Sequence, residues 1–185
     1  MMNKPASFMS VDAGPARFTT AEFLRMCEVG AFDDIKVELV NGELERMPPP
    51  GNEHGRRQMM VGIRLSRIIA EELLRGEVGI DLGKDTVLGC DAAILVAPVS
   101  GNRILRPEEV ALAVEAAETT AARDMGMKRL KYADAGIAHY WVIDGARSVV
   151  HVWSEPLNGD YAQVGIVRFG EPLAVPGTDQ TIVID

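Results

Sequence analysis

Two carboxylates and a lysine stand beside apolar segments of this chain in an arrangement that suits phosphodiester hydrolysis. Asp91 precedes the apolar run 92–96, and Glu115 ends the apolar run 110–114. Neighbouring strands lie about 4.8 Å apart, so aligned ends would let both side chains reach one divalent cation. Such a cation neutralises the phosphate and activates a water. Lys128, on the predicted helix that follows, would orient that water or stabilise the developing negative charge.

These three residues also have simpler interpretations. Acidic residues at strand ends are often only solvated. Asp124 and Lys128 are four positions apart and can form a surface ion pair worth roughly 0.3 kcal/mol. Spacing alone therefore leaves a metal site and a solvated surface both open.

Two further residues are candidates for substrate binding. His54 stands at the start of a predicted helix, where it could donate to a phosphate or bind the metal; an exposed helix-start histidine is the alternative. Glu43 follows a predicted turn and could point into the same cleft, although Glu38 and Glu45 have similar claims.

The chain is expected to form a flexible arm over residues 1–17 and a single domain over residues 18–185. The arm is rich in small residues and has no apolar periodicity. The domain is predicted to begin with a helix over residues 21–28, capped by Thr19 or Thr20. The side chains expected on the buried side of this helix are Phe23, Leu24 and Cys27.

The next segments are predicted to form a hairpin and a long helix. Apolar and polar residues alternate over residues 36–47 around Asn41-Gly42, the strongest short signal for a β-hairpin. Apolar residues recur at helical spacing over residues 53–75, which predicts a helix with Gly76 as its C-cap.

The second half of the chain is predicted to be mostly strands. A strand is expected over residues 91–96, and a strand, a helix and a strand over residues 110–143. The helix would carry Asp124, Lys128 and Tyr132 on one face. A β-meander over residues 149–184 completes the order, which predicts an α/β domain with a mixed sheet covered by helices.

Composition restricts the classes of protein. The 185 residues, 47% hydrophobic and 25% charged, suit one compact domain. The net charge of −8 argues against a non-specific nucleic-acid coat. No apolar segment approaches the roughly 20 residues of a membrane helix. Cys27 and Cys90 match no zinc or redox spacing and indicate reduced thiols in a cytoplasmic protein.

Several segments also resemble a known family. The segments ELVNGEL (38–44) and MPPP (47–50), followed by His54, resemble the N-terminal signature of the Uma-two family, bacterial endonucleases with a restriction-endonuclease-like fold. The stretch 124–144, with Asp124 and Lys128, resembles the helix and following strand of that family. The resemblance covers about residues 18 to 185.

The resemblance implies a PD-(D/E)-x-K type nuclease core: an α/β fold with a mixed β-sheet flanked by helices, an N-terminal hairpin and a C-terminal β-meander. Asp91 takes the first acidic position, Glu115 takes the second, and the lysine is displaced onto the following helix at Lys128. The implied activity is endonucleolytic cleavage of DNA with Mg²⁺, or with Mn²⁺ in its place. Analogy with restriction-type nucleases also suggests a homodimer.

Three departures from the family pattern leave alternatives open. Cys90-Asp91 stands where Pro-Asp is usual, residues 116–120 replace a turn containing serine and proline, and the strand region before Asp91 looks short. One alternative is a binding or regulatory protein that keeps the fold without turnover. Another is a metal-dependent hydrolase of small phosphoesters.

Overall fold

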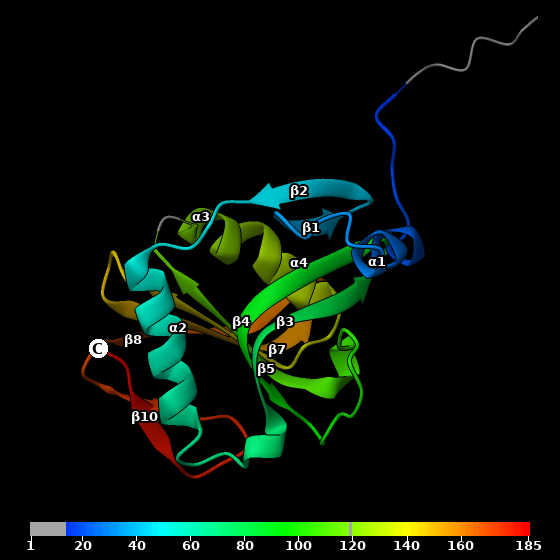
Figure 1. Ribbon diagram of the computed structural model, residues 1–185. Helices are drawn as coiled ribbons and strands as arrows, with labels where there is room; N and C mark the ends of the chain where they lie inside the picture. Colours follow the sequence, from blue (N-terminus) through cyan, green and yellow to red (C-terminus); the bar gives the residue numbers. More distant parts are fainter. Residues whose placement is uncertain (1–13, 119) are drawn as a thin grey trace, which may run out of the picture.

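An eight-stranded sheet forms the centre of the computed structural model, which describes residues 14–118 and 120–185 (Figure 1). The strand order is β2-β1-β4-β5-β6-β7-β8, with β3 also paired to β4. In chain order these strands are β1 (Lys36–Val40), β2 (Glu43–Met47), β3 (Leu74–Gly83), β4 (Thr86–Leu95), β5 (Val110–Ala117), β6 (His139–Asp144), β7 (Val149–Leu157) and β8 (Asp160–Arg168).

Helices lie against this sheet, as the sequence predicted. Strands β5 and β6 pair in parallel and the other neighbouring strands pair antiparallel, so the predicted mixed α/β fold is confirmed. The helices and helical turns are α1 (Thr20–Glu28), α2 (Asn52–Leu65), η1 (Glu71–Leu73), η2 (Pro107–Glu109), α3 (Ala121–Arg123), η3 (Asp124–Lys128) and α4 (Arg129–Asp134).

The two faces of the sheet pack into separate hydrophobic cores. On one face, Tyr132 of α4 packs with Tyr140 and Val142 of β6. On the other, Val61 and Leu65 of α2 pack with alternate residues of β5 and β6. Because successive side chains of a strand point to opposite faces, the alternation along β5 places Glu115 on the α4 side.

The N-terminal elements largely follow their local signals. Asn41 and Gly42 have positive φ angles of 51° and 81° and join β1 to β2 by a two-residue turn. Thr19 caps α1, accepting a bond from the backbone N–H of Glu22. Phe23 is buried, but Cys27 is exposed, so its predicted burial is wrong. The arm predicted over residues 1–17 falls mostly on residues 1–13, outside the described part.

The long helix predicted over residues 53–75 is wrong. Helix α2 ends at Leu65, and residues from Leu74 onward form β3. The helical spacing of apolar residues continues past the end of α2 because Ile68 and Ile69, in the loop that follows, pack against the same core as α2. Gly76 lies within β3 opposite Ala92 and caps no helix.

The strand region before Asp91 is also longer than expected. Strands β3 and β4 form a hairpin of ten residues on each side, and Asp91 lies inside β4 instead of preceding the strand. No part of the hairpin is missing. The turn at Lys84 and Asp85 has φ angles of 50° and 49°, a left-handed conformation that hid the hairpin from the apolar pattern.

The C-terminal meander is present with one modification. Strands β7 and β8 extend the main sheet, whereas β9 (Pro172–Ala174) and β10 (Thr181–Val183) pair with each other in a small second sheet. Leu173 and Ile182 of this small sheet pack on the α2 side of the core. Among the described residues, none of the helices has both the length and the apolar character needed to span a membrane.

Candidate active site

The sheet opens between β4 and β5, and the candidate site lies at this opening. The two strands pair from Leu95 and Val110 up to Ala92 and Val114 and then separate. Beyond that point β4 pairs with β1, at Leu39 and Val87. The opening is lined by side chains from β1, β2, β4 and β5, and α2 and η3 close its sides.

Asp91 lies at the point where the strands separate. Its Oδ2 accepts a 2.8 Å hydrogen bond from the backbone N–H of Ala116, an amide that β4 no longer pairs. Burial by itself raises the pKa of Asp91, but the hydrogen bonds from His54 and Ala116 outweigh it and lower the pKa below its usual value. Asp91 is therefore held as a carboxylate facing the opening.

Glu115 lies beside Asp91 and shares one oxygen with two donors. Its Oε1 accepts a 2.9 Å bond from the Lys128 ammonium and a 3.0 Å bond from the Tyr132 hydroxyl. The other oxygen, Oε2, accepts no bond from the described residues. Burial raises the pKa of Glu115 to about 8, although the charge of Lys128 opposes that shift. An extra positive charge at this place would favour the ionised form.

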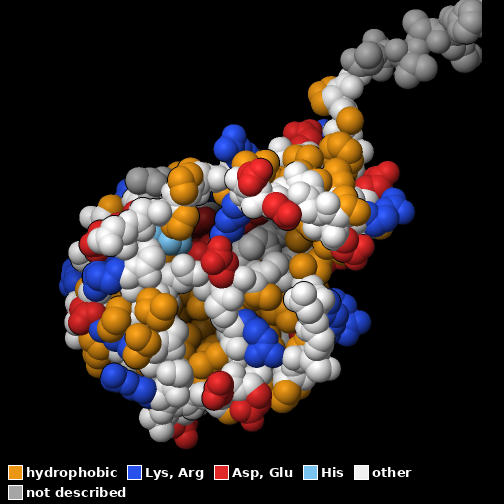
Figure 2. All heavy atoms as spheres, viewed as in Figure 1, with side chains coloured by type: hydrophobic (Ala, Val, Ile, Leu, Met, Phe, Trp, Pro, Cys, Tyr) orange, Lys and Arg blue, Asp and Glu red, His pale blue; other side chains and the backbone are white. Residues whose placement is uncertain are grey.

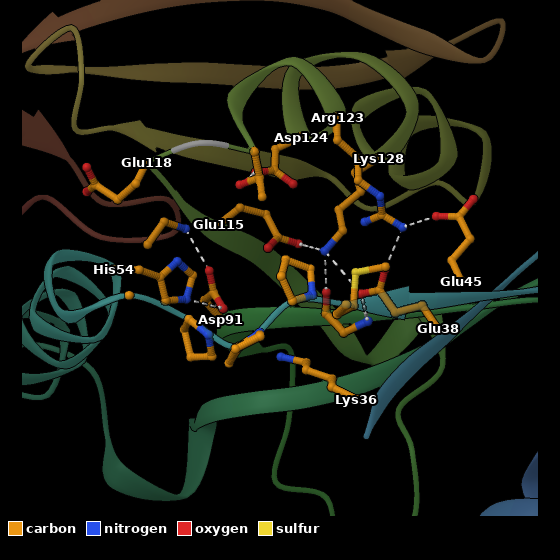
Figure 3. A pocket seen from close by; sticks show the side chains of 18 of the residues that line it. Lys36, Glu38, Glu45, His54, Asp91, Glu115, Glu118, Arg123, Asp124 and Lys128 are labelled. Carbon is orange, nitrogen blue, oxygen red and sulfur yellow. Dashed lines mark hydrogen bonds and ion pairs between the residues drawn. The ribbon is translucent and has the colours of Figure 1, made fainter. Parts of the chain in front are cut away.

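Lys128 is a buried cation with three acceptors. Besides Glu115, its ammonium lies 3.2 Å from Oε1 of Glu38 and donates to the carbonyl of Gly89 over 2.8 Å. Burial would lower the pKa of Lys128, but the neighbouring charges of Glu115 and Glu38 raise it well above its usual value. The lysine is thus a permanent cation at the base of the site (Figure 3).

The helical segment that carries Lys128 contains a π turn, η3, between α3 and α4. Asp124 and Lys128 are both buried, 4% and 5% exposed, so the surface ion pair considered from the sequence is wrong. Asp124 instead accepts a 2.6 Å bond from the hydroxyl of Thr120, and burial raises its pKa. Single π turns occur often at functional sites, and this one directs two charged groups into the same opening.

An arginine and two glutamates form the wall of the site nearest the hairpin. Arg123 lies 2.7 Å from Glu38 and 2.7 Å from Glu45, and Glu38 is only 3% exposed. Figure 3 shows Arg123 between these two carboxylates. Sequence reasoning gave Glu38 and Glu45 claims similar to that of Glu43 and did not consider Arg123; the signal for Glu38 is a charged residue between the apolar Val37 and Leu39.

The two tentative substrate-binding residues lie in different places. Nε2 of His54, at the start of α2, lies 3.4 Å from Oδ1 of Asp91, so the structure brings it into the site. The hydrogen bond with Asp91 raises the pKa of His54 more than burial lowers it. Glu43 does not line the opening: it is exposed and pairs with Arg17 at 2.6 Å.

These groups line one cleft with a volume of about 780 Å³. Figure 2 shows this face hollowed beneath the β1–β2 hairpin, with acidic, basic and histidine side chains gathered at the hollow. Pro48, Pro49 and Pro50, in the link from β2 to α2, form part of the rim, and Arg46 is an exposed cation there. The cleft is large enough for a segment of nucleic-acid backbone or a nucleotide.

The donor set fits a hard divalent cation that keeps several waters. Magnesium commonly takes one or two carboxylates and fills its other positions with water. Asp91 and Glu115 supply two carboxylates, and within the described ranges three His, Cys, Asp or Glu side chains nowhere converge as a fuller ligand cage. The lining of the cleft holds seven carboxyl side chains and four Lys or Arg side chains, so the site carries surplus negative charge.

The fold places the chain in a recognised structural class. A protein from Anabaena variabilis, whose crystal structure is described as that of "a putative nuclease belonging to DUF820", has the same fold with a TM-score of 0.65. The match covers 86% of this chain and 89% of that one, at 18% sequence identity. The structural class is therefore the mixed α/β fold of that protein.

The family follows from the sequence match. Residues 20–183 match the Uma2 family, described as "Putative restriction endonuclease". The chain belongs to this family, which confirms the resemblance drawn from the hairpin and from the stretch 124–144. Among curated proteins, none matches the chain.

Proposed function

We propose that this protein is a cytoplasmic endonuclease that hydrolyses DNA phosphodiester bonds with a divalent cation, Mg²⁺ or Mn²⁺. The observation that carries the proposal is the convergence of Asp91, Glu115 and Lys128 in one cleft. These residues come from β4, β5 and the π turn, yet they form a compact charged cluster with surplus negative charge. Membership of the Uma2 family supports the reaction class.

The residues have distinct proposed roles. Asp91 and Oε2 of Glu115 would hold the cation, which when bound neutralises the phosphate and activates a water. Lys128 would stabilise the charge that develops on the phosphoryl oxygens, because its ammonium is fixed by Glu115 and Gly89 and needs no reorganisation. His54, close to Asp91, would donate to a phosphate oxygen when protonated.

DNA would enter by the rim of the cleft. Arg46 is an exposed cation at the rim and makes no ion pair with a described residue. Its charge suits contact with a phosphate outside the cleavage point. A homodimer would supply two such clefts for two strands.

A supercoiled-plasmid nicking assay with Mg²⁺ or Mn²⁺ tests the proposal. Asp91→Asn and Glu115→Gln should abolish nicking, because each removes a cation ligand. Glu43→Gln is the matched control, since Glu43 is a carboxylate outside the cleft, and it should nick like the wild type. Equal nicking by wild type and Asp91→Asn would overturn the assignment.

A second candidate is a nuclease-fold protein with a binding or regulatory role and no turnover. The observation in its favour is that the Lys128 ammonium is already occupied by three acceptors within the protein. Calorimetric titration with Mg²⁺ separates the two: this candidate predicts no heat of cation binding at millimolar metal. Activity on model phosphodiesters without DNA affinity would instead indicate a hydrolase of small phosphoesters.

A further inference from the structure

Strand β8 leaves one edge of the main sheet unpaired. It pairs along its length with β7, from Asp160 opposite Leu157 to Arg168 opposite Val149, and it ends the strand order. No other described strand pairs with it. Five consecutive residues, 162–166, are exposed, with Val164 at 68% and Ile166 at 62%. Figure 1 shows β8 at the side of the sheet away from the β1–β2 hairpin.

The β8 edge lacks the features that normally prevent edge pairing. Edge strands are usually protected by charged residues, prolines, bulges or short length. At the other end of the sheet, β2 carries Glu43, Glu45 and Arg46 within five residues. Strand β8 has nine residues, contains no proline, and has no charged residue between Asp160 and Arg168. Its edge is thus suited to pairing with another strand.

We propose that a second copy of this chain occupies the β8 edge, with the two β8 strands antiparallel about a two-fold axis at Val164. This register sets Val164 opposite its own copy and Ala162 opposite Ile166. These residues alternate along the strand, so they share one face and would cover each other's exposed apolar surface. Gln163 would face Gly165 on the other side of the ribbon.

Charge complementarity selects this register. With the axis at Val164, Asp160 of one copy lies directly opposite Arg168 of the other, and the two-fold symmetry makes that pair twice. Arg168 is exposed and makes no ion pair with a described residue of its own chain. Asp160 has a side chain that is 45% exposed although it also contacts Arg129 at 3.0 Å. With the axis one residue away, at Gly165, Arg168 would lie opposite Ala162 and Asp160 opposite Gly170, so neither charge would meet its complement.

The pairing would close the association at two copies. A two-fold contact uses the same edge on both subunits and leaves no second β8 edge free. The cleft lies between β4 and β5, toward the other end of the strand order, so it stays open in the dimer. The inference does not rest on the proposed nuclease activity.

Oligomeric state measured by light scattering tests the surface. The wild type should approach the dimer mass as concentration rises, and Val164→Lys should remain a monomer because two lysines would meet at the axis. Val29→Lys is the matched control, since Val29, the residue that follows α1, is exposed at 81%; it should dimerise like the wild type. A monomeric wild type, a dimeric Val164→Lys or open-ended aggregates would each overturn the proposal.

Charge reversal tests the two end pairs. Asp160→Arg and Arg168→Asp should each weaken dimerisation at least several-fold, and the double variant should restore it. Arg129→Ala controls for the contact that Asp160 makes inside its own subunit, and it should leave dimerisation intact. A double variant no better than either single one would contradict the register.

Cross-linking tests the axis directly. In a Cys27→Ser background, Val164→Cys should form a disulfide with its own copy under mild oxidation, because directly opposite residues have Cα atoms about 4.5 to 5.5 Å apart. Ala162→Cys alone should not cross-link, whereas a mixture with Ile166→Cys should. Equal cross-linking by Val164→Cys and Ala162→Cys would show that the axis lies elsewhere, and circular dichroism would confirm that each variant is folded.

Discussion

Lys128 donates to Glu115 over 2.9 Å, although the two residues stand on different elements 13 positions apart. Both side chains are nearly inaccessible, at 6% and 5% exposure. A buried ion pair of this kind depends on both partners, because an unpaired charge left behind has little access to water. The pair therefore links the stability of the protein to the chemistry of its cleft.

Removing the ammonium should be costly. Lys128→Met would leave Glu115 without a cation and Glu38 with Arg123 alone, and we expect the free energy of unfolding to fall by about 3 kcal/mol. Lys84→Met is the control: Lys84 pairs with Asp134 on the surface with a side chain 74% exposed, and its loss should cost about 0.5 kcal/mol or less. Urea denaturation measures both, and equal losses would contradict the buried role of Lys128.

Glu115 should make stability depend on pH. Its pKa is raised to about 8 in the folded protein, from an ordinary value of 4.5. A raised pKa means that the folded state binds the proton more tightly than the unfolded state does, so protonated Glu115 stabilises the fold. This stabilisation is complete below about pH 4.5 and is lost as pH rises through about 8. Urea denaturation across this range should show stability falling less steeply in Glu115→Gln than in the wild type. Parallel curves would exclude Glu115 as the source.

His54 should report on cation binding. The hydrogen bond with Asp91 raises the pKa of His54. A cation that binds the Asp91 carboxylate would compete with this hydrogen bond and should therefore lower the pKa of His54. Proton NMR titrations with and without Mg²⁺ measure the shift. The imidazole of His139, whose pKa is lowered by burial alone, is an internal control that should not respond. An unchanged His54 pKa at saturating Mg²⁺ would argue against a cation at Asp91.

Gly42 should be required by the hairpin. Its φ angle is 81°, and a Cβ there would lie 3.1 Å from the carbonyl oxygen of Phe18. We expect Gly42→Ala to lower the unfolding free energy by roughly 1 to 2 kcal/mol. Gly62→Ala, within α2 and with open space for a Cβ, should instead raise it by about 0.5 to 1 kcal/mol. Thermal melts of the two variants should therefore shift in opposite directions.

The parts of the fold that could be predicted were those with local causes. Asn41-Gly42 forced a two-residue turn, and the alternation on either side gave β1 and β2. The prediction of a helix over residues 53–75 failed because apolar spacing reports burial, and Ile68 and Ile69 are partly buried although they lie in a loop. The full hairpin of β3 and β4 was missed because its turn, Lys84-Asp85, is not one of the Asn-Gly or Asp-Gly pairs that mark a two-residue hairpin turn.

The candidate site was predictable only in part, for a different reason. The apolar runs and the family resemblance predicted three site residues, Asp91, Glu115 and Lys128, and the structure brings them together. The local sequence could not show which of Glu38 and Glu43 faces the cleft, since both belong to the same hairpin. Only the pairing of β1 with β4 decides that Glu38 faces Lys128 while Glu43 faces solvent.

The π turn changes what a one-residue deletion would do to the cleft. Its i→i+5 hydrogen bonds take up one residue more than an α-helical turn would use. Deleting a residue there, such as Gly126, would therefore restore ordinary α-helical winding and leave Arg123 and Tyr132, on either side, in nearly the same relative orientation. A deletion within the ordinary helix α4 would instead turn the residues on its two sides by about 100° relative to each other.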